Sequence, residues 1–522
     1  MKQKIYIISL FALSLVLFSG CTGWLSTKPE SEIILEDYWQ SESDVQAVVA
    51  SCYRALTTSS VIYRMMIWGE LRSDNMTFGS IASSDAIGKI LNGEINSYNA
   101  YASWSAFYTV INYCNTVLYY APSVVDVDEN YTQADLLKTQ AEVRALRALC
   151  YFYLVRAFKE VPLIEDASVS DTQDYDKPKA TEDTLIAHIE TDLLFAQKYA
   201  PTDYGQTDYN KGYVTQNMVN SLLADVYLWN EDYQKCADAC DLVLADNSLS
   251  LVAGDKVLSR VFYVGNSTES IFELQFSDDD MINYAVNNMY GISGYTGFVT
   301  FPTALVDFSS GSSDRITGAY SPFNYTVSSS VTESEDDVRA KDSYYESSGL
   351  YFIFKYAGIQ RTENTSGDDT YTLRSNTANW IVYRLSDVML MKAEALVELG
   401  DYDNAMTLIN TVYKRSNEDA SDLDVANYTT QSAMEDLVLR ERQREFLFEG
   451  KRWFDLLRMA RRENSTSTIN DYMDHKASDA TSSLGVSTLN ALYMPIYYSE
   501  LDANPQLVQN SYYETNSSSS RN

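Results

Sequence analysis

A dense cluster of oppositely charged side chains near residue 445 is the first feature of the sequence that could do chemistry. Glu441 and Glu445 lie one helical turn apart, and a carboxylate pair can supply the acid and base of glycoside hydrolysis. Arginines at spacings of three and four favour ion pairs and lower carboxylate pKa values, the wrong direction for a general acid. The spacing therefore predicts a structural ion-pair network on a helix face and no catalytic residue; its members are Arg440, Glu441, Arg444, Glu445, Arg452, Asp455 and Arg458.

Other catalytic and metal-binding patterns are weak. The chain has two histidines, His188 and His475, which leaves little material for histidine-based catalysis or metal sites. Residues 126–130 are similar to the start of a calcium loop, but Tyr131 stands where that loop needs glycine. The acidic run 278–280 is typical of a solvated loop. We expect no cofactor, no bound metal and no enzymatic activity.

Periodic apolar residues predict the scaffold that must position any site. Residues 386–415 form two apolar helical stripes separated by Gly400, a helix-ending residue, which is typical of a tetratricopeptide-like hairpin. Residues 213–245 repeat this plan, and residues 141–159 predict a long helix that Pro162 ends. Such hairpins bury their apolar faces only by stacking on neighbours. The predicted fold is mostly α, with a tetratricopeptide-like helical hairpin scaffold.

The segment 262–380 has a different character, because short β-like runs alternate with loops rich in Gly, Ser and Tyr. We predict a loop-rich, partly β insertion that forms the ligand face, since loops on rigid scaffolds usually carry recognition. The 41 tyrosines of the chain suit stacking against hydroxylated ligands. The candidate ligand contacts in the loops that follow Asp74 and Asn75 and in the loop at 287–298 are Tyr98, Tyr101, Tyr290, Tyr295 and Phe298, together with Arg72, Asp74 and Asn75.

Several conspicuous residues are expected to be structural. Trp104 and Trp453 occur at helical spacing and predict core positions. The cysteines other than Cys21 show neither a disulfide framework nor metal-site pairs, and we expect small buried residues at Cys52, Cys114, Cys150, Cys236 and Cys240.

The first 20 residues have the composition of an export signal. Lys2 and Lys4 precede an apolar stretch too short to span a bilayer, and residues 17–21 resemble a lipobox that ends at Cys21. We expect removal of 1–20 and lipid modification of Cys21, which would anchor the protein to a membrane. The predicted organisation is a signal at 1–20, a tether at 21–40 and one domain at 41–522, divided into an N-terminal helical part (41–261), the insertion (262–380) and a C-terminal helical part (381–522).

The charge of the chain limits its partners. It carries 39 Lys and Arg residues against 72 Asp and Glu residues, a formal net charge of −33. Such an acidic protein is not expected to bind nucleic acid or an anionic membrane surface electrostatically.

Seven motifs follow one another along almost the whole chain. They are LSTKP (25–29), WGELRSDN (68–75), W-x3-Y-x2-I-N-x2-N (104–115), AEVRALRALCYFYLVRAFKEVPL (141–163), the hairpin at 384–416, EFLFEGKRWFDLLR (445–458) and YMPIYYSELDANPQLVQN (493–510). In this order they resemble the SusD/RagB family of outer-membrane nutrient-binding lipoproteins. No acidic run follows Cys21, so an outward-facing position is implied by the family and not by the residues.

The resemblance implies a non-catalytic, lipid-anchored protein on the surface of the outer membrane. It would bind an oligosaccharide or polysaccharide and pass it to a SusC-like TonB-dependent transporter, with ligand contacts in loops that the resemblance does not fix residue by residue. Three alternatives stay open: a peptide or glycopeptide binder of the same transporter type, a surface glycoside hydrolase, and an adhesion or scaffold protein.

Overall fold

The computed structural model describes residues 38–79, 85–170, 172–277, 281–292, 295–302, 305, 320–328, 331–333, 337–347, 350–356, 359–362, 370–373, 377–476 and 485–517. The predicted export signal, Cys21 and the acidic run 278–280 lie outside these residues. Within the described part, no helix combines the length and apolar composition needed to cross a membrane.

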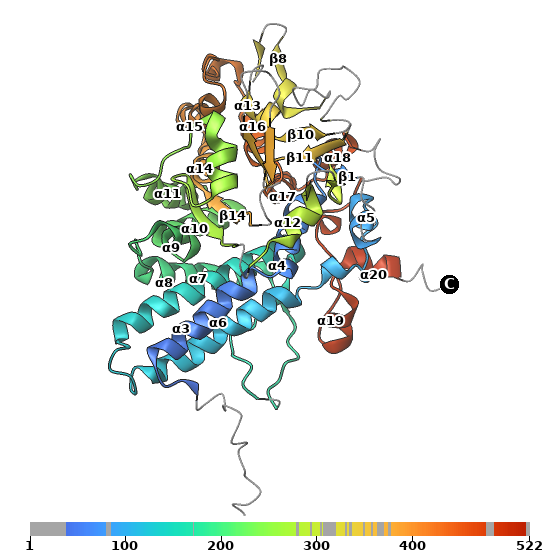
Figure 1. Ribbon diagram of the computed structural model, residues 1–522. Coiled ribbons are helices and arrows are strands. Elements are labelled where there is room, and N and C mark those ends of the chain that lie inside the picture. Colours follow the sequence, from blue (N-terminus) through green and yellow to red (C-terminus); the bar gives the residue numbers. More distant parts are fainter. Residues whose placement is uncertain are drawn as a thin grey trace, which may run out of the picture.

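Long helices pack side by side at the lower end of the molecule (Figure 1), and they are α3 (Glu42–Leu56), α6 (Ser105–Val124), α7 (Gln133–Phe158) and α8 (Glu182–Tyr199). Helix α7 begins earlier than the predicted segment because Thr132 caps it, accepting a hydrogen bond from the Asp135 N–H group at 3.3 Å. It ends at Phe158, before Pro162, as predicted. Lys159 follows with a φ of 69°, a left-handed conformation that stops the helix.

Stacked helical hairpins continue from this end. The first pairs α10 (Gln216–Trp229) with α11 (Tyr233–Leu244), and the second pairs α14 (Leu385–Glu398) with α15 (Tyr402–Ser416). Gly400 ends α14 with a φ of 80°, as its position predicted. Helix α11 packs directly against α14, although the whole insertion separates them in sequence, and α16 (Gln431–Phe446) and α17 (Arg452–Arg462) follow. The predicted scaffold of stacked tetratricopeptide-like hairpins is confirmed.

The insertion is rooted in a buried pair of strands. Strands β4 (Ser270–Leu274) and β14 (Trp380–Arg384) run antiparallel, with Trp380 opposite Leu274, and every residue of both is buried. The chain therefore leaves the helical stack and returns to it at the same place, which lets α11 and α14 meet.

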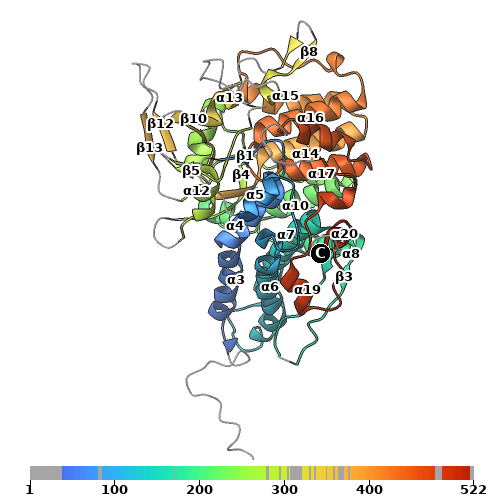
Figure 2. The same cartoon turned by 90° about the vertical axis from the view of Figure 1, so that its right-hand side faces the viewer.

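Six further pairs of short antiparallel strands occur in the described residues, most of them on one side of the helical stack (Figure 2). The pairs are β1 (Thr77–Phe78) with β7 (Val299–Thr300), β2 (Val161–Pro162) with β3 (Lys179–Ala180), β5 (Gly291–Ile292) with β6 (Tyr295–Thr296), β8 (Thr326–Ser328) with β9 (Val331–Thr332), β10 (Tyr344–Ser347) with β11 (Leu350–Ile353), and β12 (Ile359–Thr362) with β13 (Thr370–Leu373). Short helices complete the fold: α4 (Ser59–Met66), the π-helix η2 (Ile67–Leu71), α5 (Asp85–Leu91), α9 (Thr207–Gly212), α12 (Tyr284–Tyr290), α13 (Val338–Asp342), α18 (Ser467–Asp474), α19 (Tyr498–Ala503) and α20 (Ser511–Ser517).

The residues predicted to be structural lie in the core. Trp104 and Trp453 are buried. The cysteines Cys52, Cys114, Cys150, Cys236 and Cys240 are buried free thiols, so both predictions are confirmed.

The predicted ion-pair network exists, but it is buried and its main partners come from distant segments. Glu445 on α16 pairs with Arg384 of β14, with Arg415 of α15 and, at 2.8 Å, with Arg339 of α13. Arg339 also donates to Glu441 at 2.7 Å. Burial alone would raise the pKa of Glu445, but the charges of Arg415, Arg384 and Arg339 hold it well below its ordinary range. Burial raises the pKa of Glu441 against Arg339, so the predicted lowering is wrong for this residue.

Candidate functional site

The two loops that the sequence singled out lie side by side. Strand β1 follows the WGELRSDN motif, and it pairs with β7 so that Thr77 lies opposite Thr300 and Phe78 opposite Val299. The Gly79 N–H group extends the pairing by donating to the Phe298 carbonyl at 2.8 Å. A Cβ atom on Gly79 would lie 2.1 Å from the Gly297 carbonyl oxygen, so only glycine allows this approach. We refer to the surface carried by β1, β7 and their neighbouring loops as the loop face.

A buried carboxylate fixes the chain at the root of the loop face. Glu70, in the π-helix η2, accepts hydrogen bonds from the Asn75 amide at 2.8 Å and from the Phe448, Lys451 and Arg452 N–H groups at 3.1–3.3 Å. The last two N–H groups begin α17, where unpaired donors and the helix dipole favour a negative charge. Burial nevertheless raises the pKa of Glu70 to about 7. Glu70 thus ties the start of the loop to α17.

The next residues of the motif are held by equally buried partners. The Arg452 guanidinium donates to both oxygens of Asp74, at 2.9 Å each, and Gln443 donates to Asp74 at 3.1 Å and to Asn75 at 2.7 Å. Burial opposes the charge of Asp74, but Arg452 outweighs it and lowers the pKa of that carboxyl below its usual value. Because Arg452 holds both carboxylate oxygens, the pair fixes the orientation of the Asp74 side chain as well as balancing its charge.

Contacts from the C-terminal segment complete this support. The Arg72 guanidinium donates to the Leu492 and Ala491 carbonyls at 2.5 and 2.8 Å and lies 4.2 Å from the centre of the Trp453 ring. The Lys476 ammonium donates to the carbonyls of Arg72, at 3.2 Å, and Ser73, at 2.5 Å. Residues 70–76 are therefore an internal clamp beneath the loop face, and we use the name clamp for this segment.

The clamp corrects the prediction for half of the candidate ligand contacts. Arg72, Asp74 and Asn75 are no more than 7% exposed, and their polar groups are satisfied inside the protein. Tyr290 is fully buried at the end of α12, where its hydroxyl donates to the Phe448 carbonyl at 2.7 Å. These four residues hold the loops in place and are not available to a ligand, so their prediction as ligand contacts is wrong.

The other candidate contacts are distributed unevenly. Phe298 and Tyr101 are partly buried, and the Tyr101 ring lies 6.0 Å from that of Tyr63. Tyr98 is 70% exposed, but its ring packs at 4.9 Å against Tyr498 of α19. The backbone of Tyr295 lies in β6, opposite Ile292, and its side chain lies outside the described part. These residues stay predictions as ligand contacts.

An aromatic platform that the sequence reasoning missed lies beside the clamp, and we include it in the loop face. The Tyr320 ring is 55% exposed and stacks on His475, with 3.9 Å between ring centres and 12° between their planes. Burial lowers the pKa of His475, opposed by the nearby charge of Asp74. The neutral His475 ring supports the Tyr320 ring from below, so that Tyr320 presents its flat face to the solvent. No local pattern predicts this contact, because Tyr320 and His475 are far apart in the chain.

Comparison with known proteins decides the family. A family model described as the SusD family matches residues 191–513, and one described as starch-binding associating with outer membrane matches residues 23–228. The chain belongs to the SusD family.

Relatives in the SusD family share the length of the chain but little identity. The SusD-like protein P38 of Formosa agariphila is 25% identical, with 97% of this chain and 99% of that protein aligned. The starch-binding protein SusD of Bacteroides thetaiotaomicron is 23% identical over 75% of each chain. A laminarin binding SusD-like protein of known structure superposes with a TM-score of 0.67 at 22% identity, covering 91% of this chain and 100% of that one. The SusD fold, predicted from the order of the motifs, is confirmed.

The carboxylate pair noted in the sequence lies inside this SusD-family chain. Glu441 and Glu445, the carboxylate pair noted in the sequence, are at most 1% exposed and bound by arginines, so a substrate cannot reach them. No cluster of His, Cys, Asp and Glu suited to a metal ion occurs among the described residues. The chemistry that the loop face offers is ring stacking and hydrogen bonding.

Proposed function

We propose that this protein is a non-catalytic lipoprotein of the outer membrane that captures oligosaccharides at the loop face. It is anchored through a lipid on Cys21, faces outward, and passes its ligand to a SusC-like TonB-dependent transporter. The observation that carries the proposal is the pairing of β1 with β7 above the clamp, because it holds two aromatic loops in one fixed arrangement.

The family supports the class of ligand. One matching family model is described as starch-binding, one relative is named a starch-binding protein, and one similar structure is named laminarin binding. Starch and laminarin are polysaccharides of neutral sugars, which offer flat apolar ring faces and many hydroxyl groups. A surface of exposed aromatic rings with polar neighbours suits such ligands.

The energetics require more than one ring. Covering roughly 100 Å² of apolar surface contributes about 2.5 kcal/mol before costs, at about 25 cal/mol per Å². Micromolar affinity corresponds to about 8 kcal/mol net. Two or three rings together with several hydrogen bonds are therefore needed, and a rigid support that limits the entropy cost of binding raises the affinity.

Binding and hydrolysis are separated by one experiment. The purified protein, beginning at residue 22, is run through native gels that contain starch, laminarin or other polysaccharides, and each mixture is assayed for new reducing ends. Retardation by at least one polysaccharide without reducing ends is the expected result. Release of reducing ends would contradict the proposal, and so would retardation by none of them. Parallel calorimetry with peptides tests the alternative ligand class.

A further inference from the structure

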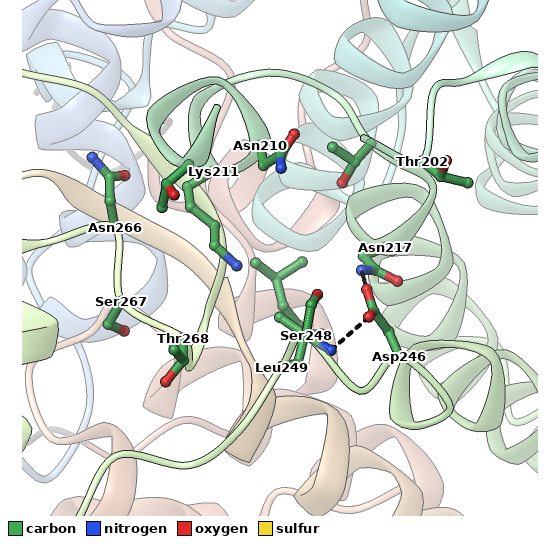
Figure 3. Close-up of a pocket in the computed structure, with 13 residues that line it drawn as sticks. Thr202, Asn210, Lys211, Asn217, Asp246, Ser248, Leu249, Asn266, Ser267 and Thr268 are labelled. Carbon is green, nitrogen blue, oxygen red and sulfur yellow. Dashed lines mark hydrogen bonds between the residues drawn. The ribbon is translucent and has the colours of Figure 1, made fainter. Parts of the chain in front are cut away.

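A hollow lies far from the loop face, on the other side of the helical stack. It is bounded by α9, the start of α10, the turn after α11 and the turn before β4, and its volume is about 200 Å³ (Figure 3). In Figure 1, α9 lies on the left of the molecule and β1 at the upper right. Most of its lining is hydroxyl and amide side chains, and Leu249 and Ile271 supply apolar surface. We call this cavity the α9 hollow.

The side chain of Lys211 points into the α9 hollow (Figure 3). Lys211 is half-buried, yet its ammonium group makes no hydrogen bond or ion pair with any residue that the structure describes. Burial lowers the pKa of Lys211, and the more distant charges of Glu273 and Asp246 oppose that lowering. An ammonium group has three N–H donors, and leaving them unsatisfied in a partly desolvated place is unfavourable. A ligand with acceptor oxygens would satisfy them.

A carboxylate at another side of the α9 hollow supplies the opposite function. Asp246 accepts hydrogen bonds from the Asn217 amide at 2.6 Å and from the Ser248 N–H group at 2.8 Å. Burial opposes its charge, but these hydrogen bonds and Lys211 lower the pKa of Asp246, so it stays ionised at neutral pH. The Asp246 carboxylate has further lone pairs that can accept hydrogen bonds from hydroxyl groups of a ligand. The hollow thus offers a strong donor and a strong acceptor to the same small volume.

This balance of charge selects the class of ligand. An anion would be attracted by Lys211 but repelled by Asp246 and by Glu273, whose charges both act on Lys211, whereas a cation would meet the ammonium group. A neutral polyol meets no uncompensated charge, and its hydroxyl groups both accept and donate. The volume is smaller than that of a typical pocket for a drug-sized ligand, which suits a single ring.

We propose that the α9 hollow is a second carbohydrate site that binds one neutral sugar residue, with Lys211 donating to sugar oxygens and Asp246 accepting from sugar hydroxyls. This inference rests on the proposed function, because it assigns the same class of ligand to a second place on the protein.

The opposite face of α9 offers a surface that further sugar residues of a longer oligosaccharide could contact. A groove of about 430 Å³ lies there, lined by the rings of Tyr209, Tyr213 and Phe276. Tyr209 is 46% exposed and packs edge-to-face on Tyr213 at 5.3 Å. Asn266 lines the hollow and Gln275 lines the groove, and their side-chain amides join the two walls through hydrogen bonds of 2.8 and 3.0 Å. An oligosaccharide that leaves the hollow over this wall reaches the Tyr209 ring, so affinity should increase with chain length.

Calorimetry on the whole mature chain tests the proposal. The probes are glucose, maltotriose, maltoheptaose and laminaritriose, with glucuronate and inorganic phosphate as anionic probes. Wild-type protein should bind at least one neutral oligosaccharide at two sites. Lys211→Met should weaken one site by tenfold or more, because a hydrogen bond from a charged donor is lost. Tyr320→Ala, on the loop face, should weaken only the other. Lys138→Met replaces an exposed lysine of α7, whose side chain is 59% exposed, and should change neither.

The outcomes separate the two proposals. If the wild type binds at a single site and Lys211→Met leaves that site unchanged, the second site is overturned and the proposed function stands. If no sugar binds at all, both proposals are contradicted. Binding of glucuronate or phosphate alone, lost in Lys211→Met, would overturn the neutral sugar assignment. Because Lys211 makes no hydrogen bond or ion pair with the residues that the structure describes, its replacement should not lower the unfolding midpoint. A lower midpoint with unchanged binding would show a structural role instead.

Discussion

Replacement of Asp74 by asparagine separates a supporting role from a ligand contact. Asp74 is 3% exposed and its partner Arg452 is 2% exposed, and two hydrogen bonds of 2.9 Å join them. Removing one charge of a buried pair leaves the other uncompensated, which typically costs about 3–5 kcal/mol. We expect Asp74→Asn to lower the free energy of unfolding by that amount in urea titrations at pH 7. The affinity of the folded protein for its glycan should change less than about threefold.

A matched exposed pair supplies the control for this variant. Asp85 and Lys89 on α5 lie 2.7 Å apart, and their side chains are 84% and 39% exposed. Asp85→Asn should cost about 0–1 kcal/mol, as exposed pairs do. Because the pKa of Asp74 is lowered in the folded state, its contribution is present above the unfolded pKa and is lost as the pH falls through the folded value. A large loss of affinity in Asp74→Asn with unchanged stability would refute the reasoning, since it would make Asp74 a ligand contact.

Three further variants test other parts of the structure. Burial raises the pKa of Glu142 to about 7, so its contribution to stability falls as the pH rises from about 4.5 to 7. The free energy of unfolding of Glu142→Gln, measured in urea, should therefore increase relative to that of wild type by up to about 3 kcal/mol between pH 5 and pH 8. An equal difference between the two proteins at both pH values would contradict this. Tyr290→Phe removes the hydrogen bond to the Phe448 carbonyl and should cost about 1–3 kcal/mol of stability without changing glycan affinity; calorimetry that shows weaker binding would speak against a buried role. Cys21→Ala should abolish labelling by radioactive palmitate and release the protein from the membrane fraction, and a labelled variant would disprove the anchor.

The helical scaffold could be predicted because its signals are local. Apolar periodicity and Gly400 define the hairpin within a few residues of the observed helices α14 and α15. The contact of α11 with α14 and the pairing of β4 with β14 join segments separated by the insertion. Nothing in either segment alone specifies its partner, so the sequence showed the hairpins but not how they meet.

The candidate site was harder to predict because polar residues have two opposite uses. The motif at 68–75 reads as a polar, ligand-ready loop, but its charges meet Arg452 and Gln443 from the other end of the chain. An exposed carboxylate and a buried, paired one look the same in sequence, and only the fold distinguishes them. The stacking of Tyr320 on His475 could not be foreseen either, because the two residues are far apart in the chain.

The most direct test of the central claim is calorimetry with a polysaccharide that retards the protein in native gels. It compares wild type with the double variant Tyr295→Ala/Tyr320→Ala. Tyr119→Ala is the control, because Tyr119 is 62% exposed on α6, at the lower end of the molecule. If the loop face grips the glycan, the double variant should bind at least tenfold more weakly with an unchanged unfolding midpoint, and the control should bind as wild type does. Equal affinity in all three proteins would contradict the account.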